Sequence, residues 1–115
     1  MLIYDKAHEL ADEIRKSEEF MTYSRLREQV MADEKTRMLI GDYKKLQLEA
    51  QAAYLSGSTP SEETMEKIKQ LGGLLAFNKD VAEYLAAEYR LQTIVGDVYK
   101  IIGDACGLAL DFLAE

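Results

Sequence analysis

The sequence predicts an all-α protein, a bundle of about five helices with a long C-terminal helix and a central αα-hairpin. The 115 residues include a single Pro, and the strongest helix formers are abundant. Apolar residues recur at spacings of three and four, which is the period of one helix face. An apolar share of 48% is enough for a core, so we expect one helical domain over residues 1–115.

Two helices are expected in the N-terminal third of the chain. The first is indicated by four apolar residues at 4-3-4 spacing: Ile3, Ala7, Leu10 and Ile14. Ser17 is followed by two glutamates, as expected for the N-cap of a second helix, because acidic residues in a first turn complement the helix dipole. The second helix should point four residues inward: Phe20, Tyr23, Leu26 and Val30.

The αα-hairpin is expected in the middle of the chain. Its first helix should be capped by Asp33 and carry an apolar row at Leu39, Tyr43, Leu46, Ala50 and Ala53. Gly57 is a natural helix stop, and Thr59-Pro60-Ser61-Glu62 reads as a capping box with Thr59 as the cap. The second helix should point Met65, Ile68, Leu71 and Leu75 inward and end near Asn78.

The longest helix is expected to begin at Lys79 and to run almost to the end of the chain. Its apolar row holds strict 3-4 spacing, broken only by Glu88: Val81, Tyr84, Leu91, Val95, Val98, Ile102, Ala105, Ala109 and Phe112. Further apolar residues flank this row, while a charged residue recurs every seven positions on the opposite side. The apolar face is therefore wider than one neighbouring helix would cover.

A second copy of the chain would bury the rest of this wide face, so we expect a homodimer or a higher homo-oligomer. The interface is expected at Tyr84, Leu91, Ile94, Val95, Val98, Ile101, Ile102, Ala105 and Phe112. Val95→Asp or Ile102→Asp should unfold the protein or dissociate the oligomer, because either change would bury an unpaired charge.

Composition excludes several classes of function. A net charge of −7 repels phosphate backbones, so we expect no DNA binding. The only cysteine is Cys106, which rules out an intrachain disulfide and suits a reducing compartment. The chain has no apolar run approaching the roughly 20 residues that cross a bilayer and no signal peptide pattern, so we expect a cytoplasmic protein without membrane insertion.

Candidates for chemistry are few. Asp5 and His8 share one helix face, but a di-iron bundle needs a second such pair and this sequence has one histidine. Cys106 lies beside the apolar row and is expected to be a buried, inert thiol. The sequence shows no arrangement of nucleophile and base and no phosphate-binding glycine loop, so we expect neither enzymatic activity nor a cofactor or metal.

A basic middle segment offers an alternative surface for an acidic partner or for RNA. Its residues are Arg25, Arg27, Lys35, Arg37, Lys44 and Lys45, interleaved with acidic residues. Direct RNA binding through this segment is the alternative function, and it would weaken steeply with salt.

Two parts of the sequence resemble the YlbF/YmcA/YheA family of small helical proteins of Gram-positive bacteria. One part runs from Ser17-Glu18-Glu19-Phe20 through Tyr23, Val30 and Asp33 to Leu39-Ile40, Tyr43 and Leu46-Gln47; the other comprises Asn78, Val81, Tyr84-Leu85 and Ala87-Glu88. The likeness extends over nearly the whole chain. They are face and cap residues, and a catalytic signature is not among them.

The resemblance implies a cytoplasmic helical protein that forms homodimers or assembles with family paralogues. In the better-studied branch, it implies a regulator of competence, sporulation and biofilm formation that acts on mRNA processing by the membrane-anchored endoribonuclease Y. Cluster-binding members carry a cysteine-rich tail, and Cys106 alone does not reproduce it, so the iron–sulfur role is not carried over. The YheA-like branch fits the sequence equally well.

Overall fold

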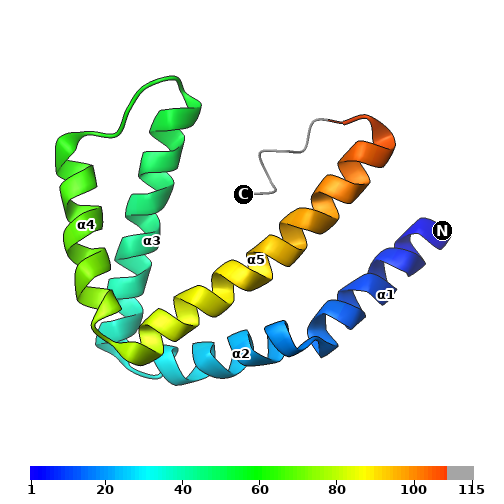
Figure 1. Cartoon of the computed structure of the whole chain (residues 1–115), viewed down its shortest axis with the longest axis horizontal. Coiled ribbons are helices and arrows are strands. Elements are labelled where there is room, and N and C mark those ends of the chain that lie inside the picture. Colours follow the sequence, from blue (N-terminus) through cyan, green and yellow to red (C-terminus); the bar gives the residue numbers. More distant parts are fainter. Residues whose placement is uncertain (109–115) are drawn as a thin grey trace. The chain divides into compact units, whose positions relative to one another are not determined.

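The computed structural model describes residues 1–108, and these residues form five α-helices (Figure 1). In chain order they are α1 (Leu2–Lys16), α2 (Glu18–Met31), α3 (Glu34–Leu55), α4 (Glu62–Ala76) and α5 (Lys79–Cys106). The all-α fold, the long C-terminal helix and the central hairpin predicted from the sequence are confirmed.

Short polar side chains separate the first three helices, as predicted. The Ser17 hydroxyl accepts a hydrogen bond from the Phe20 amide at 3.2 Å and donates to the Ile14 carbonyl at 2.5 Å, so it serves the end of α1 and the start of α2. The Asp33 carboxylate accepts from the Thr36 amide at 2.9 Å and from the Thr36 hydroxyl at 2.5 Å. These bonds satisfy amides that a helix N-terminus leaves without partners.

A Schellman motif ends α3 at the predicted position. Gly57 has a φ of 85°, and its amide donates to the Tyr54 carbonyl at 3.1 Å. The Ser58 amide donates to the Ala53 carbonyl at 3.0 Å, which completes the pair of bonds of this motif. A residue with a Cβ would be strained at this φ, so the glycine sets where the helix stops.

The predicted cap of α4 is wrong by two residues. Ser61, not Thr59, is the N-cap: its hydroxyl accepts from the Thr64 amide at 3.1 Å, and Pro60 precedes the helix. Both residues have a hydroxyl, so the motif alone could not choose between them. Met65 is also not inward as predicted, because the half-buried Thr64, four positions before Ile68, takes that place on the packed face.

α3 and α4 form an antiparallel hairpin whose register is set by Tyr43 and Gly72. A Cβ placed on Gly72 would lie 3.3 Å from Cε1 of the Tyr43 ring, whereas a Cβ on Gly73 would meet nothing within 4 Å. The aromatic ring therefore occupies the space that a side chain at residue 72 would need.

α5 begins where predicted and ends earlier than predicted. The Asn78 side-chain oxygen accepts from the Val81 amide at 3.2 Å and caps the helix. At the other end Gly107 has a φ of 71°, and the Leu108 amide donates to the Gly103 carbonyl at 2.9 Å, which is a second Schellman motif. The prediction of one helix through Phe112 is therefore wrong beyond Cys106, and Ala109 and Phe112 lie outside the described residues.

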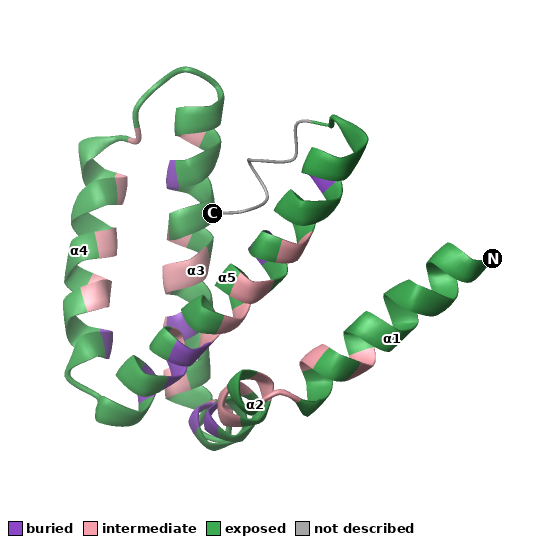
Figure 2. Ribbon diagram, turned by 45° about the vertical axis from the view of Figure 1, so that its right-hand side comes forward, coloured by how far each residue is buried: buried purple, intermediate pink, exposed green. Residues whose placement is uncertain are grey.

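The chain divides into two compact units. The first combines Met1–Arg27 with the described part of Tyr84–Glu115, and its most buried side chains are Leu26, Tyr84 and Ala87. The second is Glu28–Glu83, with its most buried side chains at Val30, Ile40, Ala50, Leu75 and Val81 (Figure 2). Ile40 is fully buried although it stands outside the predicted apolar row of α3.

Candidate protein interaction surfaces

The predicted interface on α5 is covered at its start and exposed farther along. Tyr84 is 1% exposed and stacks on Tyr23, so its side chain is already buried within the chain. Leu91, Ile94 and Val98 are half-buried. The exposed members begin with Val95, at 38%, and continue with Ile102 at 48%, Ile101 at 68% and Ala105. Phe112 lies outside the described residues.

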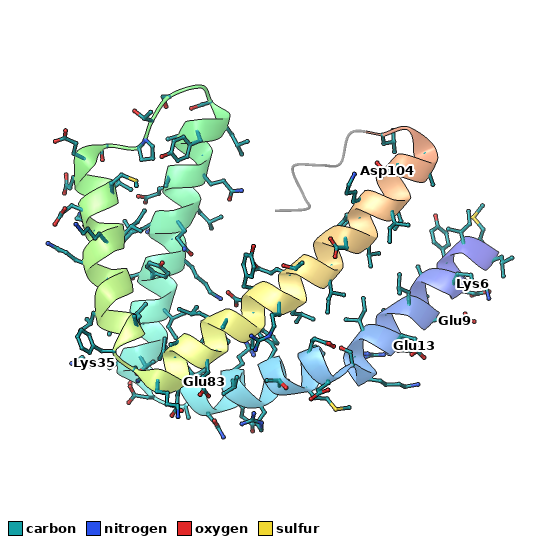
Figure 3. The ribbon with its side chains drawn as sticks, viewed as in Figure 1. Lys6, Glu9, Glu13, Lys35, Glu83 and Asp104 are labelled. Atoms are coloured by element: carbon teal, nitrogen blue, oxygen red, sulfur yellow. The ribbon has the colours of Figure 1, made fainter. Side chains whose placement is uncertain are left out.

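The farther part of α5 carries a continuous apolar strip, hereafter the α5 face, made of the exposed Val95, Ile101, Ile102 and Ala105 and the half-buried Val98. Spacings of three and four place these residues on one side of the helix. Asp97 and Asp104 (Asp104 is labelled in Figure 3) belong to the charged row predicted on the other side, and the Lys100 ammonium lies 3.2 Å from the Asp104 carboxylate. The α5 face is therefore apolar, bordered by charge and wide enough to receive a second helix.

Glu88, the one break in the apolar row of α5, has a hydrogen-bonding role. The Tyr84 hydroxyl donates to its carboxylate at 3.1 Å, one helical turn away, and Glu88 is half-buried. A buried tyrosine hydroxyl needs a partner, and a carboxylate at i+4 supplies one. The charge in this position is thus explained by the ring that stacks on Tyr23.

α1 is an amphipathic helix with no buried residue. Its apolar stripe, at Ile3, Ala7, Leu10 and Ile14, was predicted correctly as a pattern, but only Ile14 is half-buried. On its polar sides Lys6 lies 3.4 Å from Glu9 (Figure 3), and Arg15 forms an ion pair with Asp12. The α1 stripe is a second apolar surface, and Ile3, Ala7 and Leu10 are exposed in the described chain.

The basic residues of the predicted alternative surface do not form one patch within either unit. Arg25 and Arg27 belong to the first unit, whereas Lys35, Arg37, Lys44 and Lys45 belong to α3 in the second. On α3, Lys45 stands between two carboxylates, Asp42 at i−3 and Glu49 at i+4. Helical neighbours of opposite charge lower the attraction of such a lysine for phosphate.

The residues considered for chemistry are isolated in the described structure. His8 is exposed on α1, and nowhere in residues 1–108 do three His, Cys, Asp or Glu side chains gather closely enough to hold a metal ion. Cys106 is exposed, which contradicts the prediction of a buried thiol. It is the last residue of α5, where the helix ends at Gly107, and the prediction assumed that the helix continued.

A groove along the α3–α4 hairpin was not predicted from the sequence. It has a volume of about 570 Å³ and is lined by Asp42, Lys45, Leu46 and Glu49 of α3 and by Lys67, Gln70, Leu71 and Leu74 of α4. At i+3 from Leu74, Phe77 is 92% exposed, and at i−4 from Asp42, Met38 is 62% exposed. These two apolar side chains lie outside every predicted apolar row, and they are the signal in the sequence that could have indicated the groove.

The helices also bear on membrane association. Across residues 1–108, none of them combines the length and the apolar content that a bilayer-spanning helix requires.

Both the fold and the sequence of this chain are similar to those of known proteins. A solved structure of a protein of unknown function (DUF964) from Bacillus stearothermophilus matches with a TM-score of 0.73 over 93% of this chain and 94% of that one, at 21% identity. UPF0342 proteins of Halothermothrix orenii and Symbiobacterium thermophilum are each 37% identical, over 89% and 96% of this chain and 86% and 98% of their own lengths.

A family model also matches most of the chain. The match runs over residues 3–106, from the first turn of α1 to the last residue of α5, so it includes the α1 stripe, the hairpin and the α5 face. The match confirms the family resemblance that was predicted from the sequence. The chain belongs to the YlbF/YmcA family, which is described by its link to control of the competence regulator ComK.

Proposed function

We propose that this protein is a non-catalytic regulatory adaptor that associates with itself through the α5 face and binds other proteins through its remaining surfaces. The family link to control of ComK supports a regulatory role. The observation that carries the mechanism is the exposure of Ile101, at 68%, and Ile102, at 48%, on a regular helix. Large aliphatic side chains in one exposed strip are typical of a surface that a partner covers.

We also propose where the adaptor acts in the cell and which processes it controls. The adaptor acts in the cytoplasm, in control of competence, sporulation or biofilm formation, through assemblies with family paralogues or RNA-processing machinery. Its role is to change mRNA processing without contacting RNA itself, which suits a net charge of −7 and a basic segment divided between two units. The alternative function is direct RNA binding, which a measurement of RNA binding by the purified protein would reveal.

Sedimentation of the purified protein tests the self-association. Ile101→Asp and Ile102→Asp should each weaken the oligomer at least tenfold, because each would place a carboxylate in an apolar contact. Both residues are exposed within the chain, so the variants should keep the helical circular dichroism of the wild type. Asp97→Asn, on the charged side of α5, is the matched control and should leave the oligomer unchanged.

A wild-type chain that sediments as a monomer at micromolar concentration would contradict the self-association. The regulatory part is tested in the native cell, by measuring ComK-dependent transcripts in strains that carry Ile101→Asp or Asp97→Asn at equal protein levels. We expect a change in the first strain only. Binding of the purified protein to RNA that falls steeply with salt would favour the alternative function.

A further inference from the structure

Two apolar surfaces remain after the α5 face is assigned: the α1 stripe and the α3–α4 groove. The α1 stripe is a single helix face about three turns long, in a helix of 15 residues. The groove lies between the antiparallel helices α3 and α4; Leu46, Leu71 and Leu74 form its leucine floor, and the rest of its lining is polar or charged. An amphipathic helix laid into an apolar groove is a common mode of protein recognition.

The groove has an apolar end and a charged end. The contact between Tyr43 and Gly72 sets the antiparallel register, which brings Met38 level with Phe77 and Glu49 level with Lys67. At the first end the exposed apolar side chains are Met38, Leu74 and Phe77, and the exposed Asp42 lines the groove level with Leu74. At the second end Glu49 stands on α3 and Lys67 on α4, where Lys67 lies 3.0 Å from Glu63.

The α1 stripe has two borders of different chemistry. Lys6 and Glu13, seven residues apart, follow one side of the stripe; Tyr4, Ala11 and Arg15 follow the other. The helix is also apolar at its start, where Leu2, Ile3 and Tyr4 are all exposed, and charged at its end. α1 therefore has the same polarity along its length as the groove.

The two charge patterns match in one orientation. When α1 lies parallel to α3 with Tyr4 over Met38, Arg15 falls over Glu49, because both intervals are eleven residues. Because α-helices are right-handed, the border with Arg15 then lies over α3 and the border with Lys6 and Glu13 lies over α4. Glu13 comes within one turn of Lys67 there. Neither Glu13 nor Glu49 forms an ion pair in the described part of the chain.

The reversed orientation is unfavourable. It would bring Ile3 and Tyr4 to the charged end of the groove and Arg15 to the exposed Phe77 and Leu74. The present ion pairs of Arg15 with Asp12 and of Lys67 with Glu63 are exposed, so exchanging them for new partners costs little.

We propose that α1 of one copy docks in the α3–α4 groove of a second copy, parallel to α3, with Ala7 and Leu10 on the leucine floor, Ile3 at the apolar end, and the pairs Arg15–Glu49 and Glu13–Lys67 at the charged end. This contact goes beyond the self-association through the α5 face, since it uses different helices. It supplies the α1 stripe with a partner, and it gives the family fold a second surface for assembly.

Thiol cross-linking between two distinguishable full-length chains tests this contact. In a Cys106→Ser background, one chain carries Arg15→Cys and the other, labelled with ¹⁵N, carries Glu49→Cys. After mixing and treatment with a short bis-maleimide, mass spectrometry should show a cross-linked pair of one light and one heavy chain. The matched control replaces Arg15→Cys by Lys16→Cys, one residue along α1 on its polar side, and should give at least fivefold less product.

Two results would overturn the proposal. One is an equal yield of cross-linked product from Arg15→Cys and from Lys16→Cys, each paired with Glu49→Cys. The same result is expected if the groove binds a helix of another protein. The other is cross-linking within a single chain that carries both Arg15→Cys and Glu49→Cys, since α1 would then fill its own groove. Repeating the experiment with Ile101→Asp in both chains keeps the two contacts apart: the α1 product should persist there even though the α5 contact is lost.

Charge reversal gives an independent readout. Glu13→Lys and Lys67→Glu should each weaken self-association about two- to fivefold at low salt, as expected for one exposed ion pair. A chain with both changes restores opposite charges across the contact and should recover wild-type affinity. Additive loss in the double variant would contradict the predicted pairing.

Discussion

The rings of Tyr23 and Tyr84 are stacked, with centroids 5.7 Å apart and an angle of 23° between their planes. Tyr23 also meets Phe20 in a tilted arrangement at 6.5 Å. These aromatic residues join α2 to α5 inside the first unit, and the Tyr84 hydroxyl is held by Glu88. A predicted interface residue thus turns out to stabilise the fold of the chain itself.

Tyr84→Ala should lower the free energy of unfolding by about 3–5 kcal/mol, because it leaves a cavity where a fully buried ring stacks on Tyr23. Tyr84→Phe keeps the ring and removes the hydroxyl donor to Glu88, so it should cost about 1 kcal/mol. Urea unfolding followed by circular dichroism measures both. A Tyr84→Ala protein as stable as wild type would show that the stacked pair is not part of the core.

Gly73→Ala should stabilise the protein by up to about 1 kcal/mol, because alanine is the better helix former and a Cβ there meets nothing. Gly72→Ala gains the same propensity but crowds the Tyr43 ring at 3.3 Å, so its net effect should be smaller or destabilising. The two variants are compared by their unfolding midpoints in urea. Equal stabilisation by both would mean that the Tyr43 ring moves aside freely.

Ser61→Ala should destabilise the protein by about 1 kcal/mol, since it removes the acceptor for the Thr64 amide at the start of α4. Thr59→Ala is the control, because Thr59 precedes the helix and is not its cap. Thermal unfolding should separate the two variants. The capping box predicted from the sequence would regain support if Thr59→Ala proved to be the costlier change.

The Asp33 cap should make stability depend on pH. Hydrogen bonds from the Thr36 hydroxyl and amide hold the pKa of the Asp33 carboxyl below its ordinary value of 3.8. A carboxyl with a lower pKa in the folded state stabilises the fold above its unfolded pKa, and this contribution is lost as the pH falls through the folded value.

Asp33→Asn keeps the oxygen acceptor and loses the ionisation. The difference in unfolding free energy between wild type and Asp33→Asn should therefore shrink as the pH is lowered from 7 through about 3.8 and below. Glu34→Gln, in the same first turn, is the control for helix-dipole effects. A difference that stays constant over this range would exclude the cap as the source of the pH dependence.

Much of the α5 face was predictable, because the 3-4 spacing of Val95, Val98 and Ile102 is written in the sequence. The groove was not, because it exists only when Tyr43 packs on Gly72 and so sets the register of two helices. Met38 and Phe77 could have indicated the groove, because they are large apolar residues outside every predicted apolar row. The pattern of one helix, however, does not show which other helix will lie beside such residues.

The sequence alone determined the helices and most of their ends. Capping bonds such as those of Ser17 and Asp33, and the positive φ of Gly57, are local, so the neighbouring residues decide them. Only the tertiary structure decided which apolar faces are covered: Tyr84 is buried and Ile101 is exposed on the same helix. Periodicity shows that a face is apolar, whereas burial depends on which other helix reaches it, and that is a property of packing between distant parts of the chain.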